Sequence, residues 1–345
     1  MKLKNLFRSV LFFLLLVTFS ADAFDYALEY PKGKRIEDSF QPSYDNIEIG
    51  LEQFRQSAHN HLVDSTAKAL HDFFSEGVPH GTCYGQSFTF MLLNPPTAKK
   101  MQFLNKDAAQ LQILWFQSQN AIHVFFRNQT DELMKKGLDI IRQGNPGQAI
   151  NEDMNLIEIS DEMAKLKPEL VSLEAITEYN AFFKSSIQLM KFAQIRDKEE
   201  KEILAKKGFT EFPRKTLKKS DFKKNEYQKK VQEALEGLAK NPSISDVVVS
   251  FDLDVDGTPS AHAILVQLKH ARVYDANSGL YRYKSKKDLI NDIVVTRQKG
   301  CELVILRPYA YQNKDGKPSS KNEKPKKDHK KSKDQKKGKK GKGKN

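Results

Sequence analysis

The feature that most constrains the fold of this 345-residue chain is a change of pattern at Asn241-Pro242. Before this point, apolar residues recur at intervals of three and four, which is typical of amphipathic helices. After it, the segment DVVVSFDLDVDG alternates and ends in an Asp-Gly turn, and the runs AHAILVQL, RVYDANSG, LYRY and CELVILRPY continue the strand pattern. Because helices and strands are segregated along the chain, the sequence predicts an α+β fold with an antiparallel sheet.

Glycine, proline and asparagine divide the helical part of the chain. One helix is expected over residues 47–75 and ends at Gly77-Val78-Pro79, and a second follows Thr82 and stops before Asn94-Pro95-Pro96. Further helices are expected over residues 108–127, 131–143, 173–205, 220–239 and 286–292. Residues 24–45, rich in Pro, Gly, Asp and Tyr, are expected to form an extended lead-in.

The first 23 residues have the pattern of a secretory signal peptide. Three basic residues precede an apolar run, Val10–Phe19, and Ala21-Asp22-Ala23 supplies a small-x-small cleavage site. The apolar run is shorter than the ~20 residues that span a bilayer, which favours cleavage before Phe24 over a membrane anchor. The sequence therefore predicts a secreted or periplasmic protein with no transmembrane segment after cleavage.

The charge of the chain is concentrated at its other end. Residues 312–345 contain fifteen lysines, no arginine and four acidic residues, so this tail carries +11 of the formal net charge of +13. The signal peptide carries the remainder, and residues 24–311 are about neutral. A tail of Lys, Gly, Ser and Pro cannot bury a core and is expected to be disordered. It is expected either to bind anionic lipid, nucleic acid or acidic polysaccharide, or to act only as a solubilising extension.

The two cysteines, Cys83 and Cys301, allow two interpretations. In a secreted protein, a disulfide between them is the simpler one. The other is a reactive thiol, because Cys83 follows the expected N-cap Thr82 and begins a helix, and a helix N-terminus favours the thiolate. The amide of Cys83 is also placed to bind a developing oxyanion, and Gly81 and Gly85 would let a substrate backbone approach.

A nucleophilic thiolate needs a base, and His262 is the best candidate among the eight histidines. It begins a strand in the sequence Ser-Ala-His-Ala, where small neighbours leave the ring accessible. His80 is close to Cys83 in sequence but has no obvious carboxylate partner, and His123 lies within an apolar helix, where a structural role is more common.

The group that orients His262 is expected one hairpin later. A two-residue loop at Lys269-His270 would place His262 opposite Asn277, with Asp275 one diagonal step away on the same face. A shift of one residue would move Asp275 to the other face, so Asn277 remains an alternative orienting residue.

These motifs together resemble a known family. The segment Gly81–Ser87 reads Gly-x-Cys-x-Gly-x-Ser, and far downstream follow the Ser-Ala-His-Ala strand and an Asp-x-Asn-x-Gly turn. The three windows resemble papain-like cysteine proteases, in particular the YopT/AvrPphB type found among secreted bacterial virulence effectors. The resemblance implies a papain-like fold and protein cleavage, with Cys83 as nucleophile, His262 as general base and acid, and Asp275 as orienting residue.

Three departures limit what the resemblance implies. The turn reads Asp-Ala-Asn where the family usually has Asp-Pro-Asn, the stretch between Cys83 and His262 is long, and a cleavable signal peptide is unusual for injected effectors. The prenylated small GTPases cleaved by YopT are therefore not carried over as substrates.

No cofactor or metal is expected. The segment Asp252-Leu-Asp-Val-Asp-Gly257 resembles the opening of an EF-hand loop, but its twelfth position is Ala263, which cannot supply the bidentate carboxylate. Alternation along a strand explains the aspartates better.

The sequence thus predicts three segments: a signal peptide at 1–23, a papain-like catalytic domain at 24–311 with a helical insertion at about 100–240, and a disordered Lys-rich tail at 312–345. The expected function is a secreted cysteine protease that cleaves peptide or isopeptide bonds in proteins, host proteins included. The alternative is a non-enzymatic surface-binding or adhesin-like protein with a Cys83–Cys301 disulfide, in which the tail docks on anionic surfaces.

Overall fold

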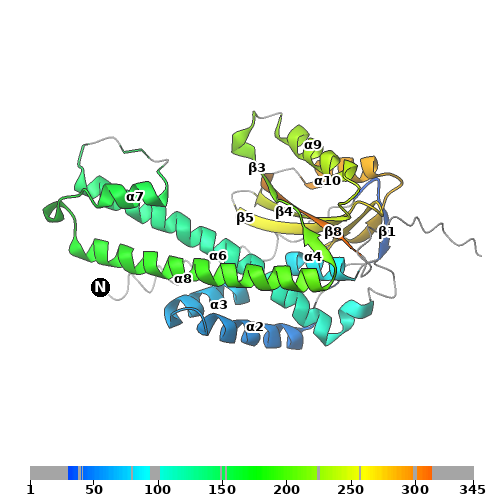
Figure 1. The fold of residues 1–345 in the computed structure, drawn as a ribbon, viewed down its shortest axis with the longest axis horizontal. Helices are drawn as coiled ribbons and strands as arrows, with labels where there is room; N and C mark the ends of the chain where they lie inside the picture. Colours follow the sequence, from blue (N-terminus) through cyan, green and yellow to red (C-terminus); the bar gives the residue numbers. More distant parts are fainter. Residues whose placement is uncertain are drawn as a thin grey trace, which may run out of the picture.

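The α+β class predicted from the sequence is confirmed by the computed structural model (Figure 1). The signal-peptide segment and the tail after Gln312 lie outside the residues that the structure describes. Those residues are 30–37, 40, 42–78, 81–93, 102–147, 150–151, 154–223, 226–255, 258–297 and 301–312.

Eight α-helices are formed by the described residues. They are α2 (Tyr44–His59), α3 (Asp64–Gly77), α4 (Cys83–Leu92), α6 (Asp107–Gly144), α7 (Leu156–Met163), α8 (Leu173–Lys206), α9 (Tyr227–Lys240) and α10 (Lys286–Arg297). None of these helices combines the length and the apolar composition needed to cross a membrane.

The strands of the described residues form one eight-stranded sheet whose pairings are all antiparallel. Its order is β1-β7-β6-β5-β4-β8-β2, and β3 also pairs with β8. The strands are β1 (Lys34–Glu37), β2 (Phe209–Glu211), β3 (Lys215–Lys218), β4 (Asp246–Val255), β5 (Thr258–Gln267), β6 (Arg272–Asp275), β7 (Gly279–Arg282) and β8 (Cys301–Tyr311).

Helices cover both faces of the sheet. Successive residues of β4 point to opposite faces, so Val247 and Val249 pack in the core that includes α9 and α10, whereas Val248 packs in the core that includes α4. The central strands are therefore buried on both sides, which explains their near-continuous apolar runs.

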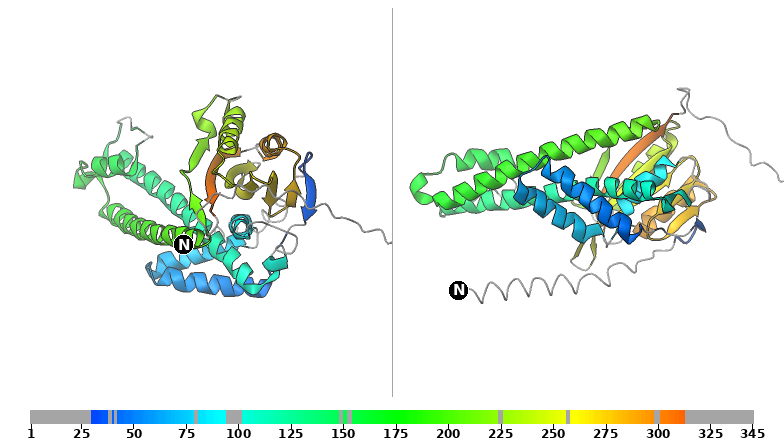
Figure 2. Two further views of the ribbon diagram at one scale, coloured as in Figure 1. Left: turned by 45° about the vertical axis from the view of Figure 1, so that its right-hand side comes forward. Right: turned by 90° about the horizontal axis from the view of Figure 1, so that it is seen from below.

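Helices α6 and α8 run side by side away from the sheet and form an arm with α7 at its far end (Figures 1 and 2). The far end of the arm has its own hydrophobic core, which includes Ile141, Ile159 and Tyr179. Nearer the sheet, α2 and α3 pack against α6. The segment expected as a helical insertion thus forms the arm, two short strands and α9.

Two helix predictions were wrong. The helix expected over 47–75 is broken at residues 60–63 into α2 and α3, which fold against each other so that the rings of Phe54 and Phe74 meet at 4.7 Å between centroids. Conversely, the helices expected over 108–127 and 131–143 are one helix, α6. The hydroxyl of Thr130, in the interior of α6, donates to the carbonyl of Phe126 at 2.9 Å, so this polar residue does not break the helix.

Candidate active site

Cys83 is the first residue of helix α4, which packs on one face of the sheet against β4, β5 and β6. Thr82 is the N-cap as predicted, but its side chain makes no capping hydrogen bond to the backbone; its hydroxyl accepts a hydrogen bond from Gln86 Nε2 at 2.7 Å instead. One free amide at the start of α4 is bonded by a residue of the arm: Gln117 Oε1 accepts a hydrogen bond from the amide of Gly85 at 3.0 Å. The amide of Cys83 is one of the first four of the helix, which have no partner within the helix itself.

Helix α4 is held tightly against its neighbours. Nearly all of its residues are buried, and the ring of Phe90 stacks on that of Tyr274 in β6 with centroids 4.2 Å apart. Tyr274 in turn donates to Gln86 Oε1 at 2.6 Å. Because Tyr274 precedes Asp275 in the chain, these contacts fix the helix that carries the thiol against the strand that carries the carboxylate.

The hairpin β5–β6 brings His262 and Asp275 together. The predicted register is confirmed, since Ile264 pairs with Asp275 and Gln267 with Arg272. His262 Nε2 lies 3.0 Å from Asp275 Oδ1, and both side chains are buried. Since an ionised carboxylate only accepts hydrogen bonds, Nε2 of His262 donates to it.

Asn277, the alternative orienting residue, has a different place. Its backbone amide donates to Asp275 Oδ1 at 2.9 Å, while the imidazole of His262 is bonded to the Asp275 carboxylate. Asn277 thus supports the carboxylate through its main chain, and the expectation that its side chain takes the place of Asp275 is corrected.

The imidazole of His262 and the amides of Ala263 and Tyr84 lie close to the Cys83 thiol and favour its charged form. Burial raises the pKa of Cys83, but the charge and the hydrogen bond of His262, together with the two amides, outweigh it and leave the pKa below its ordinary value. This arrangement favours the thiolate form of Cys83, with the carboxylate of Asp275 on the other side of the imidazole.

The two glycines near Cys83 are not alike. A Cβ atom at Gly85 would lie 1.9 Å from the carbonyl oxygen of Ile113, so this glycine is required for the close approach of α4 and α6. The expectation that Gly85 makes room for a substrate is corrected for this reason. Gly81 is half-buried just before the helix, and its role toward a substrate stays a prediction.

The disulfide alternative is contradicted, because Cys83 and Cys301 are both free. They belong to different hydrophobic cores, Cys83 to the one with α4 and Cys301 to the one with α9 and α10. Burial raises the pKa of Cys301 to about 11, so this thiol is expected to be unreactive at neutral pH.

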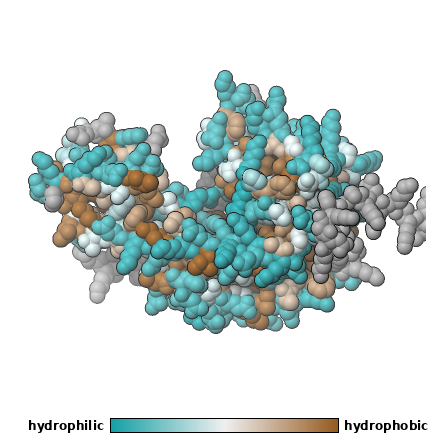
Figure 3. All heavy atoms as spheres, in the orientation of Figure 1, coloured by the Kyte–Doolittle hydropathy of each residue, from teal (hydrophilic) through white to brown (hydrophobic). Residues whose placement is uncertain are grey.

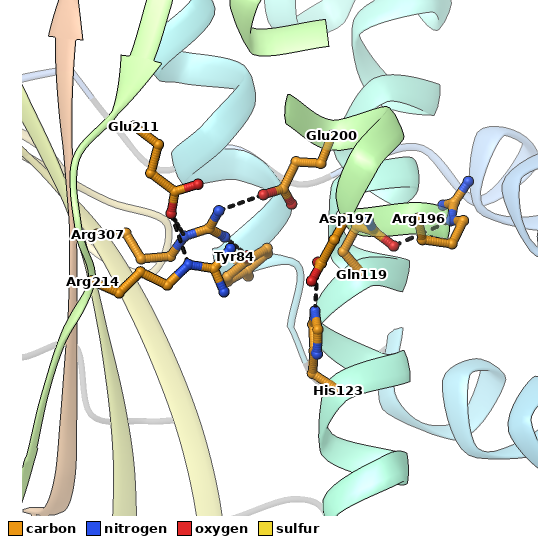
Figure 4. Close-up of polar contacts among 9 residues, drawn as sticks. All are labelled: Tyr84, Gln119, His123, Arg196, Asp197, Glu200, Glu211, Arg214 and Arg307. Atoms are coloured by element: carbon orange, nitrogen blue, oxygen red, sulfur yellow. Dashed lines mark hydrogen bonds and ion pairs between the residues drawn. The ribbon is translucent and has the colours of Figure 1, made fainter. Parts of the chain in front are cut away.

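A buried ion-pair cluster adjoins Tyr84, the residue after Cys83 (Figure 4). Arg307 of β8 donates to Glu200 of α8 at 2.5 Å, to Glu211 of β2 at 2.9 Å and to the hydroxyl of Tyr84 in α4. Arg214 also binds Glu211, at 2.8 Å. The cluster thereby connects the arm, the edge of the sheet and the start of α4 through the guanidinium of Arg307. Its members are distant in sequence, so no local pattern predicts it. Beside it, His123 Nε2 lies 2.9 Å from Asp197 Oδ1, which joins the two helices of the arm.

The aspartate-rich segment beginning at Asp252 lies largely in β4, where Asp252 pairs with Ala261 across the hairpin and forms an ion pair with Arg127 at 2.5 Å. Residues 256 and 257 lie outside the described part of the chain. Within that part, no group of three or more His, Cys, Asp or Glu side chains is arranged to hold a metal ion.

No protein-family model matches the chain, and neither the curated proteins nor the solved structures gave a significant match.

Proposed function

We propose that the protein is a cysteine protease that hydrolyses peptide or isopeptide bonds through Cys83, His262 and Asp275. The observation that carries the proposal is the convergence of these residues: a thiol at a helix N-terminus, whose pKa is lowered by His262, and an imidazole of His262 that is hydrogen-bonded to the buried carboxylate of Asp275. A helix carrying the thiol packed against an antiparallel sheet carrying the histidine is also the arrangement that a papain-like enzyme would have.

The chemistry follows from the positions of the groups. The Cys83 thiolate attacks the carbonyl carbon of the scissile bond, and the resulting oxyanion is stabilised by the Cys83 amide. The His262 imidazolium gives its proton to the leaving nitrogen, which leaves a thioester on Cys83. His262 then takes a proton from water, the hydroxide attacks the thioester, and the carboxylic acid leaves as the thiol is restored. Throughout, Asp275 holds the ring and stabilises its charged form.

The first test measures thiol reactivity and peptide cleavage together. In the native protein at neutral pH, Cys83 should be alkylated by iodoacetamide faster than Cys301, because only Cys83 has a lowered pKa. Cys83→Ala should lower kcat/KM on a peptide library by on the order of 10³-fold or more. Cys301→Ser, the matched control, should leave cleavage unchanged. A Cys83 that reacts no faster than Cys301 would contradict the proposal.

The Lys-rich tail supports a second, separate function. Its net charge of +11 adjoins a mature body that is about neutral, which favours binding to polyanions at a surface. We propose a secreted enzyme whose tail holds it near anionic lipid, nucleic acid or polysaccharide, while the folded body acts on a protein substrate.

A further inference from the structure

The phenol of Tyr30 reaches the carboxylate behind the candidate catalytic histidine. Tyr30 belongs to the lead-in before β1, far from the hairpin in sequence, yet its hydroxyl donates to Asp275 Oδ2 at 2.8 Å. Tyr30 is 2% exposed, and its ring packs on that of Tyr281 with centroids 4.9 Å apart. The hydroxyl is therefore held at the carboxylate by a buried, well-packed ring.

Both oxygens of Asp275 receive hydrogen bonds, and they do so from different parts of the chain. Oδ1 is bonded to the Asn277 amide at 2.9 Å and to His262 Nε2 at 3.0 Å, while Oδ2 accepts the Tyr30 hydroxyl. Asp275 is fully buried, so donors are needed to stabilise its charged form. Donors on both oxygens also fix the rotation of the carboxylate, and this rotation decides where the lone pair that meets His262 points.

We propose that Tyr30 is a positioning residue for the candidate triad. It fixes the Asp275 carboxylate and, through it, the orientation of the His262 ring toward Cys83. This inference rests on the proposed function, and it makes the lead-in before β1 part of the active site.

A kinetic comparison of two buried tyrosines tests the inference. Tyr30→Phe removes the donor and should lower kcat roughly tenfold with KM unchanged, as expected for the loss of one hydrogen bond to a charged group. Tyr227→Phe is the matched control, because Tyr227 is buried in the same core but its hydroxyl binds the carbonyl of Leu217 at 3.2 Å. It should leave kcat and KM unchanged.

A spectroscopic readout separates positioning from a loss of stability. The Nε2–H proton of His262 should give a low-field resonance. It should move further downfield in Tyr30→Phe, because a carboxylate that loses one donor accepts more strongly from the other. 3-Fluorotyrosine at residue 30 is nearly isosteric and a stronger donor, so it should fold even if Tyr30→Phe does not and should move the resonance upfield.

The outcomes distinguish this inference from the proposed function. If the unaltered protein cleaves no peptide but the resonance moves as expected, the protease proposal fails and the positioning role stands. If the resonance is the same in the unaltered protein, Tyr30→Phe and the fluorotyrosine protein, the positioning role is overturned, whatever the activity.

Discussion

At the scale of single residues, the candidate site depends on which side chain meets Nε2 of His262. The hairpin brings the Asp275 carboxylate to this nitrogen and leaves Asn277 to contribute a backbone amide. A carboxylate stabilises the imidazolium by charge as well as by a hydrogen bond, whereas a backbone amide bonded to that carboxylate only fixes its position. The two residues can therefore be told apart by substitution.

We expect Asp275→Ala to lower kcat by on the order of a hundredfold or more, because the imidazolium loses both its charge partner and its orienting acceptor. Asn277→Ala should change kcat only a few-fold, since it keeps the backbone amide that binds Asp275 Oδ1. The measurement is kcat and KM on one peptide substrate, with the alkylation rate of Cys83 alongside. A larger loss in Asn277→Ala than in Asp275→Ala would show that the asparagine side chain is the orienting group.

A second buried carboxylate, Asp246, is not part of the candidate triad and should affect the stability of the fold. Asp246 in β4 pairs with Gln267 in β5, and Gln267 Nε2 donates to Asp246 Oδ1 at 3.1 Å. Burial raises the pKa of Asp246 from 3.8 to about 6. A carboxyl whose pKa is raised in the folded state stabilises the fold fully below pH 3.8, and this stabilisation is lost as pH rises to about 6.

We therefore expect Asp246→Asn to increase the free energy of unfolding at pH 7 by up to ~3 kcal/mol, because the amide cannot ionise. The gain should shrink as pH falls from 6 to 4 and vanish near pH 3.5. Among the described residues, Gln267 Oε1 has no hydrogen-bond partner, and the new amide group offers a donor beside it. Urea unfolding of both proteins across this pH range measures the difference, and a gain that does not depend on pH would contradict the assignment.

At the scale of secondary structure, the position of α4 depends on its contact with α6. Because Gly85 has no Cβ atom, α4 can lie close to the carbonyl of Ile113 in α6. Gln117, also in α6, accepts a hydrogen bond from the Gly85 amide. The arm therefore supports the helix that carries Cys83 directly, and a change in this contact should reach the thiol.

We expect Gly85→Ala to destabilise the protein by roughly 1–3 kcal/mol, because a Cβ here forces α4 away from α6. It should also slow alkylation of Cys83, whose position depends on that helix. Gly237→Ala is the control: a Cβ at Gly237, within α9, meets no atom within 4 Å. Alanine there should stabilise the helix by about 0.5–1 kcal/mol. The denaturant midpoints of the two variants and of the unaltered protein measure both effects. If Gly85→Ala has the same midpoint as the unaltered protein, α4 can move away from α6 without loss of stability.

The elements that could be predicted from the sequence are those with local signals. The hairpin β5–β6 has alternating apolar residues and a tight loop, so its register could be predicted, but the choice between Asp275 and Asn277 as the partner of His262 stayed open until the structure showed it. Strands β1, β2 and β3 were not predicted, because each has only three or four residues and pairs with a strand distant in sequence. The hydrogen bond of Tyr30 to Asp275 could not be predicted for the same reason, because the two residues are distant in sequence.

At the scale of the whole molecule, the folded body consists of a sheet with its covering helices and a long arm formed by α6, α7 and α8. The arm helices α6 and α8 have 38 and 34 residues, and apolar side chains lie exposed among polar ones at its far end, where Leu173 is 79% exposed (Figure 3). The amide of Gln312 donates to Gly208 at 2.8 Å, directly after α8. Gln312, the last residue that the structure describes, thus lies at the base of the arm.

Deletion of residues 313–345 should leave the fold and the cleavage of small peptides unchanged, because the tail has no apolar residues with which to pack and the candidate triad lies in the folded body. What should change is binding to polyanions. Each lysine that contacts a polyanion releases counterions, so the affinity of the full-length protein for heparin, DNA or anionic vesicles should fall steeply as salt rises.

The truncated protein, whose body is about neutral, should elute from heparin at low salt. A control with the same tail length, in which half of the lysines are replaced by glutamine, should elute in between, since the effect depends on charge and not on length. Equal retention of the three proteins across a salt gradient would contradict the assignment and would indicate a basic surface on the folded body instead.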